Sequence, residues 1–195
     1  MTIIAIQIQI SYFALIGVFA LIVSRTLMMR KKGIRVMVFG KTDKSDFLLL
    51  IVIALLIYPA IANAAGLPMW QPLVTPFWAN SISGWIGLSL CVLAIIGLIF
   101  TLHSFGESVR VGIDEENPGK LVTTGMFRVS RNPLYLCIII FFFGFFFIHR
   151  NVVAAAIIVF VILAVHRQIL REEAFLKKHY GSEFDLYCAK TRRYI

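Results

Sequence analysis

The chain has 195 residues, of which 59% are hydrophobic and only 15% are charged. A charged fraction this far below the roughly one quarter that is usual in soluble domains excludes an ordinary soluble fold and predicts an integral membrane protein. The net charge of +9 does not indicate a nucleic-acid partner, because the basic residues flank apolar segments.

Five apolar runs follow one another along the chain, at 3–23, 47–65, 82–102, 134–148 and 152–165. About 20 apolar residues cross roughly 30 Å of hydrocarbon, so each run is a candidate membrane helix. Only three residues separate the last two runs, which predicts a tight helical hairpin. No Gly or Pro follows position 165 until Gly181, so the fifth helix should continue into a polar C-terminal extension. We expect one all-α membrane domain, 1–195.

The Lys and Arg residues predict how these helices cross the membrane. Seven of them lie at 24–46, four at 103–132 and seven after position 165, whereas none lies at 63–81. By the positive-inside rule the first loop, the third loop and the C-terminus are cytoplasmic, and the N-terminus is outside. Residues 1–10 carry no Lys or Arg, so the first run should be a retained helix and not a cleaved signal peptide.

The fourth run begins with a polar head, "SRNPLY", at 130–135. Asn132 is a good helix cap and Pro133 fits the first turn. Arg131 and Tyr135 could serve only as anchors at the membrane interface. The alternative is that the positive helix end faces the cytoplasm and binds an anionic part of a polar ligand.

An acidic pair interrupts the last predicted helix. On a helical wheel Glu172 falls in the middle of an apolar stripe, while Glu173 lies at its edge and is expected to be solvated. A buried carboxylate needs a partner. For Glu172 that partner is either a salt bridge to Arg128 or Arg131, or a ligand hydroxyl or amine.

The third loop, 103–132, is long for a connection between membrane helices, which is typical of functional loops. Its segments 108–113 and 120–125 read as short extended pieces. It contains no glycine-rich nucleotide-binding motif. His103 and His166 could meet at the inner interface, but neither has a metal-binding spacing, so we expect no metal.

Two spaced motifs, "GKLVTTGMFRVSRNPLY" at 119–135 and "EEAFLKKHYGSEFDLY" at 172–187, resemble the isoprenylcysteine carboxyl methyltransferase family. The resemblance covers 103–195 and implies that this half binds the cofactor, whereas the three helices within 1–102 carry no signature. It implies S-adenosylmethionine at the cytoplasmic side, held by Gly119, Lys120, Leu121, Val122, Phe127, Asn132, Pro133, Leu134, Tyr135 and Glu172.

The resemblance further implies methylation of the α-carboxylate of a C-terminal prenylated cysteine, or of a similar lipophilic carboxylate that enters from the bilayer, with S-adenosylhomocysteine as product. Such a carboxylate is already ionised at neutral pH, so positioning can replace a general base. Arg167 or Arg131 is the candidate for orienting it, and Glu172 for holding the cofactor. The chain departs from the family at Asn132, where His is frequent, and at Gln168, where eukaryotic members have a substrate-linked arginine.

Three alternatives remain open at this stage. Phospholipid N-methyltransferases share this layout and cofactor but methylate an amine. Membrane sterol reductases bind NADPH and have a related pattern, approximated here by Arg131 to Tyr135, Tyr180-Gly181 and Tyr187-Cys188, although this chain is short for one. A non-enzymatic membrane subunit would need no cofactor, and its Glu172 would only pair with an arginine.

Overall fold

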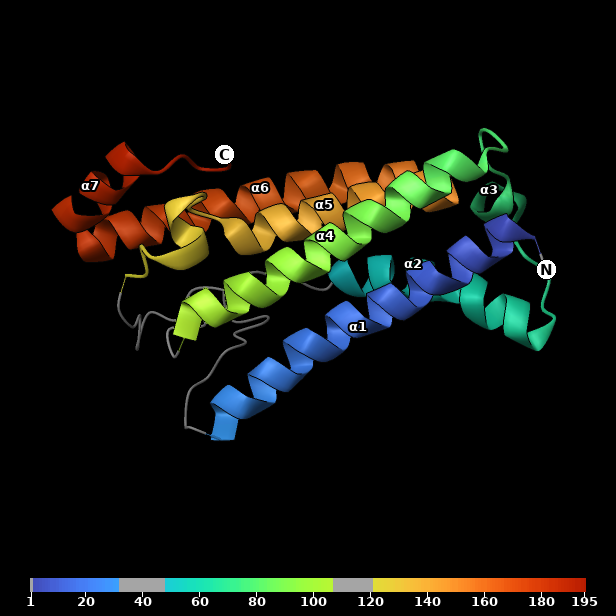
Figure 1. The fold of residues 1–195 in the computed structure, drawn as a ribbon, viewed down its shortest axis with the longest axis horizontal. Helices are drawn as coiled ribbons and strands as arrows, with labels where there is room; N and C mark the ends of the chain where they lie inside the picture. The colour runs from blue at the N-terminus through green and yellow to red at the C-terminus, as the bar shows by residue number, and fades with distance from the viewer. Residues whose placement is uncertain (1, 32–47, 107–120) are drawn as a thin grey trace.

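The computed structural model describes residues 2–31, 48–106 and 121–195, and all regular structure within them is helical (Figure 1). The elements, in order, are α1 (Ile3–Lys31), α2 (Leu48–Ala65), α3 (Gln71–Val74), α4 (Ser81–Phe105), the 3-10 helix η3 (Gly125–Arg128), α5 (Pro133–His149), α6 (Val152–Tyr180) and α7 (Ser182–Lys190). The expected extended piece at 108–113 lies outside the described residues. The extended piece expected at 120–125 is wrong at position 125, because η3 begins there.

Each predicted apolar run is a helix. Three of these helices, α1, α4 and α6, are long and apolar enough to span a membrane. The fourth, α5, has 17 residues, which at 1.5 Å per residue gives about 25 Å, slightly less than the hydrocarbon thickness. The described residues therefore confirm an all-helical fold with helices that are apolar enough to span a membrane, while five crossings remain a prediction.

The predicted hairpin of α5 and α6 is confirmed, with Arg150 and Asn151 as its turn. The Asn151 side chain caps α6 by accepting a hydrogen bond from the Ala154 amide at 2.8 Å. Arg150 has a left-handed backbone with φ 53°. The helix α6 then runs on to Tyr180 and stops at Gly181, as its sequence predicts.

Two glycines bring α4 and α5 into close backbone contact. A Cβ atom on Gly144 would lie 2.6 Å from the Gly87 carbonyl oxygen, and one on Gly87 would lie 2.5 Å from the Gly144 carbonyl oxygen. Small residues permit this approach between membrane helices, where packing replaces the hydrophobic effect as the driving force. Cys91, which is buried, fills the space beside Gly144.

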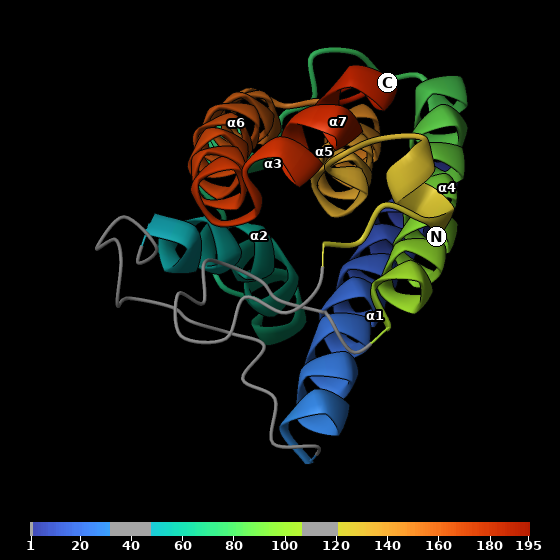
Figure 2. The same ribbon diagram turned by 90° about the vertical axis from the view of Figure 1, so that its left-hand side faces the viewer.

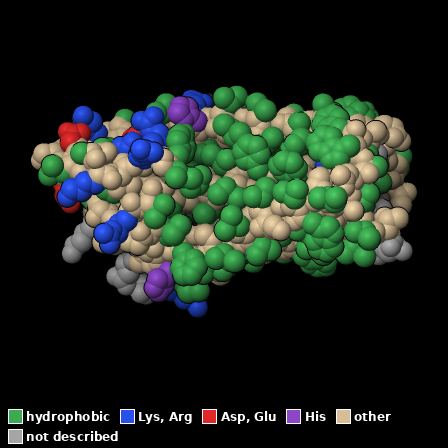
Figure 3. Space-filling model, turned by 45° about the horizontal axis from the view of Figure 1, so that its top comes forward, with side chains coloured by type: hydrophobic (Ala, Val, Ile, Leu, Met, Phe, Trp, Pro, Cys, Tyr) green, Lys and Arg blue, Asp and Glu red, His purple; other side chains and the backbone are tan. Residues whose placement is uncertain are grey.

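The outer surface of the bundle is apolar. Large hydrophobic side chains such as Phe13 and Phe19 of α1 and Val159 and Leu163 of α6 are exposed. On the face drawn in Figure 3, such side chains cover most of the length of the molecule, and the Lys and Arg side chains gather at one end. A surface of this kind fits lipid and not water.

The two ends of the bundle differ in character. We call the charged end the basic end; it carries η3, the start of α5, the end of α6, helix α7 and the tail, residues 191–195 (Figure 2). The opposite end, with α3 and the turn between α5 and α6, is called the far end (Figure 1).

At the far end, a buried arginine joins two loops. The Arg150 guanidinium donates hydrogen bonds to the Asn80 carbonyl and, at 3.2 Å, to the Ser83 hydroxyl. Its own carbonyl accepts from the Phe77 amide at 2.6 Å. The residue is only 1% exposed. The side chain and backbone of Arg150 therefore hold the segment before α4 against the turn between α5 and α6.

Replacing Arg150 should destabilise the protein through the loss of its side-chain hydrogen bonds. We expect Arg150→Ala to cost about 2 kcal/mol, since hydrogen bonds from a charged donor contribute roughly 1.5 to 3 kcal/mol and alanine keeps the left-handed strain that arginine already has. Arg150→Gly should cost about 1 kcal/mol less, because glycine relieves that strain. Thermal unfolding in detergent would measure both, with exposed Lys190→Ala as the control. Equal stability of Arg150→Gly and the wild type would contradict this role.

Candidate active site at the basic end

The helix α5 begins at Pro133, after the polar residues at 130–132, as expected, but the Asn132 side chain does not cap it. Asn132 occupies the cap position, and its backbone carbonyl accepts from the Leu136 amide at 3.0 Å. Its side chain makes no capping hydrogen bond. It donates instead to Glu173 Oε1 at 3.2 Å and to the Arg193 carbonyl at 3.1 Å. The expectation of a side-chain cap was wrong because a buried carboxylate and the tail lie within reach of this amide.

Glu173 is the buried member of the acidic pair, at 9% exposure. Arg193 binds its Oε2 atom through Nε at 3.0 Å and through Nη2 at 2.8 Å. These hydrogen bonds raise the pKa of Arg193. Arg131 lies on the other carboxylate oxygen, with Nε at 3.5 Å from Oε1. The expectation of a solvated Glu173 was therefore wrong, and Arg131, one of the two arginines considered as a partner of Glu172, pairs with Glu173.

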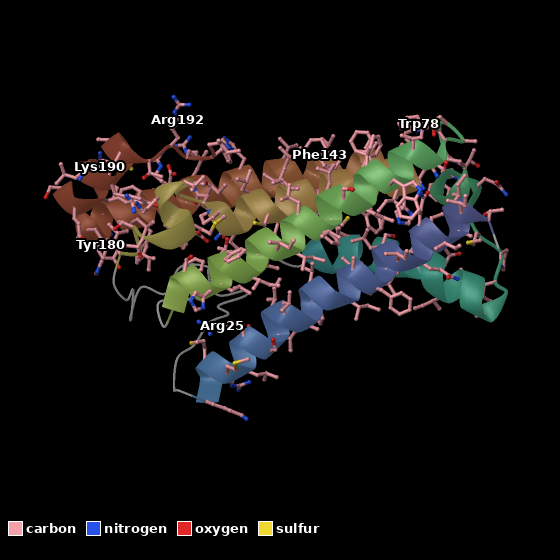
Figure 4. The ribbon with its side chains drawn as sticks, viewed as in Figure 1. Arg25, Trp78, Phe143, Tyr180, Lys190 and Arg192 are labelled. Carbon is pink, nitrogen blue, oxygen red and sulfur yellow. The ribbon has the colours of Figure 1, made fainter. Side chains whose placement is uncertain are left out.

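The C-terminal tail supplies the polar partners of Glu173 and Asn132. After Gly181 the chain reverses into α7, and the tail then runs back along the bundle to the head of α5 (Figure 1). The Arg131 amide donates to the Arg192 carbonyl at 3.0 Å, and the Ser130 hydroxyl donates to the Arg193 carbonyl at 3.3 Å. The Arg192 side chain itself points away from the bundle (Figure 4). The backbone of the tail thus closes over a face of α6 that is open in an isolated helix.

A contact between the rings of Tyr194 and His166 also holds the tail against α6. The Tyr194 hydroxyl lies 2.6 Å from His166 Nδ1, and the two rings stack. His166, considered above as a metal ligand, is therefore engaged with the tail.

Glu172 lies beside this cluster and is half-buried. The Tyr135 hydroxyl donates to its Oε1 atom at 2.5 Å, and Gln168 Nε2 donates to the same atom at 2.9 Å. Tyr135, one turn into α5, is 9% exposed. The structure therefore joins three residues named from the sequence, and places a carboxylate with a hydroxyl partner close to the positive end of α5.

The predicted loop residues form a separate apolar cluster under α7. Phe127, Phe184 and Tyr187 are buried there, and Leu121 and Val122 pack against them. The Tyr187 hydroxyl donates to the Phe127 carbonyl at 2.7 Å, and burial raises the pKa of Tyr187. Gly119 and Lys120 lie outside the described residues.

Arg131 connects the apolar cluster to the acidic pair. Its Nη1 atom donates to the Cys188 sulfur, which borders the cluster, while its Nε faces Glu173. Pro133 and Leu134 are buried behind it. Arg167, the other candidate for orienting an acceptor, is exposed on α6.

The sequence did not indicate the role of Arg193, the contact of Arg131 with Cys188 or the burial of Glu173. The available signals were weak: a second acid beside Glu172 and basic residues after α7. The pairing of Glu173 with Arg193 depends on the reversal of the chain at Gly181. Gly181 has a left-handed φ of 53° there.

A family model, described as phospholipid methyltransferase, matches residues 82–183, which is just over half of the chain. The chain belongs to the phospholipid methyltransferase family. This phospholipid methyltransferase match runs from α4 through the head of α5 and the acidic pair to the first residues of α7. No curated protein and no solved structure matches the chain.

Family membership makes this protein a membrane methyltransferase and disfavours the reductase and the non-enzymatic subunit. It confirms the resemblance at the level of integral membrane methyltransferases, to which the isoprenylcysteine enzymes are related. The matched region contains Asn132, Tyr135 and Glu172. Arg193, which holds Glu173, lies beyond it.

The residues at the basic end fit S-adenosylmethionine in their chemistry. That cofactor carries an ammonium, a carboxylate, a sulfonium and an adenosine. Glu172 with the Tyr135 hydroxyl suits a cationic or hydroxyl group. The N-terminus of α5 suits a carboxylate, and the apolar cluster with Leu121 and Val122 suits an aromatic base.

Proposed function

We propose that the protein transfers a methyl group from S-adenosylmethionine to the amine head group of a phospholipid, at the basic end and on the cytoplasmic side. The observation that carries this proposal is the half-buried Glu172 carboxylate, held by Tyr135 and Gln168 where the apolar bundle meets its polar end. The gathering of Lys and Arg at this end supports the cytoplasmic side.

The cofactor supplies the methyl group on its sulfonium. In our proposal Glu172 and Tyr135 hold its cationic or hydroxyl groups, and the start of α5 faces its carboxylate. Leu121, Val122 and Phe127 form the apolar wall, and the contacts of Gly119 and Lys120 stay a prediction from the sequence. Asn132 is a positioning residue, because its amide holds Glu173 and the tail.

The choice of an amine over a carboxylate rests on the arginines. A carboxylate acceptor calls for a cation to orient it. Arg131 is engaged by Glu173 and Cys188, and Arg193 by Glu173. Arg167 is exposed. Two of the three candidate guanidinium groups, those of Arg131 and Arg193, are thus already bound to Glu173, and the family is itself described by phospholipids.

An amine acceptor changes the proton chemistry. An ammonium has no lone pair, so the acceptor would have to release a proton to bulk water before its nitrogen could take the methyl group, with S-adenosylhomocysteine as the leaving product. In our proposal Glu172 holds the cofactor, and its negative charge would also stabilise the methylated ammonium as it forms. Tyr135 fixes that carboxylate through its hydroxyl.

The acceptor is tested by methyl transfer in nanodiscs, with labelled S-adenosylmethionine and either phosphatidylethanolamine or N-acetyl-farnesylcysteine. We expect label in the phospholipid. Label only in the farnesylcysteine would overturn the amine and restore the prenylated cysteine. Binding of S-adenosylhomocysteine by calorimetry, with NADPH as the control titrant, tests the cofactor separately, and binding of NADPH alone would remove the methyltransferase proposal.

The pH dependence gives a second distinction. The reactive form of an amine is deprotonated, and a primary amine has a pKa near 10. The kcat/KM for an amine acceptor should therefore rise about tenfold per pH unit between pH 6 and 8. For a carboxylate, already ionised above about pH 5, it should stay flat. The affinity for S-adenosylhomocysteine, measured at each pH, shows whether the protein stays folded. A flat pH profile of kcat/KM with the phospholipid would contradict the requirement that the amine lose a proton.

A further inference from the structure

A small pocket lies at the far end, between α1, α2, α5 and α6, away from the candidate active site. Its walls are mainly apolar and include Leu56, Phe145 and Ile157, and its polar lining residues are Tyr12, His149 and Asn151. Its volume is about 20 Å³, and it is only partly enclosed. A space of that size accepts about one water molecule or one hydroxyl group.

The hydrogen bonds of His149 fix which of its nitrogens carries the proton. The Ser11 hydroxyl donates to the Ile8 carbonyl at 2.7 Å. A hydroxyl has one proton to give, so at 3.0 Å it accepts from His149 Nε2. In a neutral imidazole, Nδ1 is then an acceptor, and the described residues offer it no hydrogen-bond donor. The ring stays in place because it stacks on Phe145 at 4.0 Å.

Tyr12 presents the complementary group. Its ring packs edge-on against His149 at 5.4 Å and against Phe145 at 6.2 Å. Its hydroxyl makes no hydrogen bond within the described part of the chain. Tyr12 and His149 both line the pocket. A donor and an acceptor without partners in an apolar bundle are costly, since hydrocarbon offers neither.

We infer that this pocket binds the hydroxyl group of an uncharged membrane alcohol, whose hydrocarbon chain leaves through the open side into lipid. One hydroxyl meets both needs, because it donates to His149 Nδ1 and accepts from Tyr12. An anionic or cationic head group is too large for the space and would lack a counter-ion among the lining residues. The charge on Arg150, the residue after His149, is buried against Asn80 and Ser83.

Photo-crosslinking in nanodiscs tests this inference. The probe is a long-chain primary alcohol with a diazirine close to the hydroxyl, and its control is the matching methyl ether, which cannot donate a hydrogen bond. We expect the alcohol to label peptides that contain Tyr12 or His149 at least fivefold more than the ether does. Equal labelling by the two probes would overturn the inference and leave ordered water as the partner of these groups.

Two variants test whether labelling depends on the pocket itself. Tyr12→Phe keeps the ring and removes the donor, so labelling by the alcohol should fall at least threefold. Val153→Trp fills the pocket, whereas Val159→Trp on the same helix faces outward at 57% exposure and should change nothing. Unchanged labelling in both Tyr12→Phe and Val153→Trp would also sink the proposal, and thermal unfolding of each variant verifies its folding.

Discussion

Replacing Glu172 with glutamine should weaken cofactor binding at least tenfold and leave stability nearly unchanged. The amide keeps the shape and can still accept the Tyr135 hydroxyl, but it loses the charge, and charge-assisted contacts are roughly twice as strong as neutral ones. Calorimetry should use both S-adenosylmethionine and S-adenosylhomocysteine. A larger loss for the former would place the carboxylate near the sulfonium. Unchanged affinity for both would remove Glu172 from the site.

The neighbouring substitution should give the opposite pattern. Glu173→Gln leaves Arg131 and Arg193 without their shared counter-charge. Breaking a buried ion pair costs roughly 3 to 5 kcal/mol. We expect about 2 kcal/mol here, because the Arg193 side chain is 37% exposed and can be partly rehydrated.

The release of the tail gives Glu173→Gln a second readout. Hydrogen exchange over 188–195 should speed up, since the tail loses its anchor at Arg193. The control is Asp185→Asn, which breaks an exposed pair with Lys177 at 3.1 Å and should have almost no effect on stability. Equal effects of Glu173→Gln and Asp185→Asn would contradict the structural role of the buried pair.

Gly144→Leu should disrupt the bundle more than any substitution on its surface. Even a Cβ atom at this position would meet the Gly87 carbonyl oxygen at 2.6 Å and the Cys91 sulfur at 2.8 Å. The first of these is a backbone atom, so α4 and α5 must separate. Overpacking ordinarily costs about 1 to 3 kcal/mol, and a larger side chain against backbone should reach or exceed the upper value.

The matched control is Gly17→Leu in α1, where a Cβ atom would meet nothing within 4 Å. That substitution should be neutral or slightly stabilising, because leucine favours helix more than glycine does. The melting temperature and the monodisperse fraction in detergent measure both variants. A Gly144→Leu protein as stable as Gly17→Leu would show that the close contact of α4 with α5 is not required.

Much of the fold was predictable because it depends on contiguous residues. The apolar runs, the short turn before Val152 and the uninterrupted segment up to Gly181 specify the helices, their hairpin and their polar extension without reference to distant parts of the chain. The motif around Tyr135 and Glu172 was equally visible, and these two side chains do meet.

The sequence by itself therefore determined the membrane class, the helices and two of the residues at the site, because hydropathy and helix ends are local properties. Only the tertiary structure decided that Glu173 is buried and that Arg193 holds it, and only the tertiary structure brought Gly87 to Gly144 and Ser11 to His149. A polar side chain is buried or solvated according to which distant segment covers it. A helical wheel contains no information about that segment.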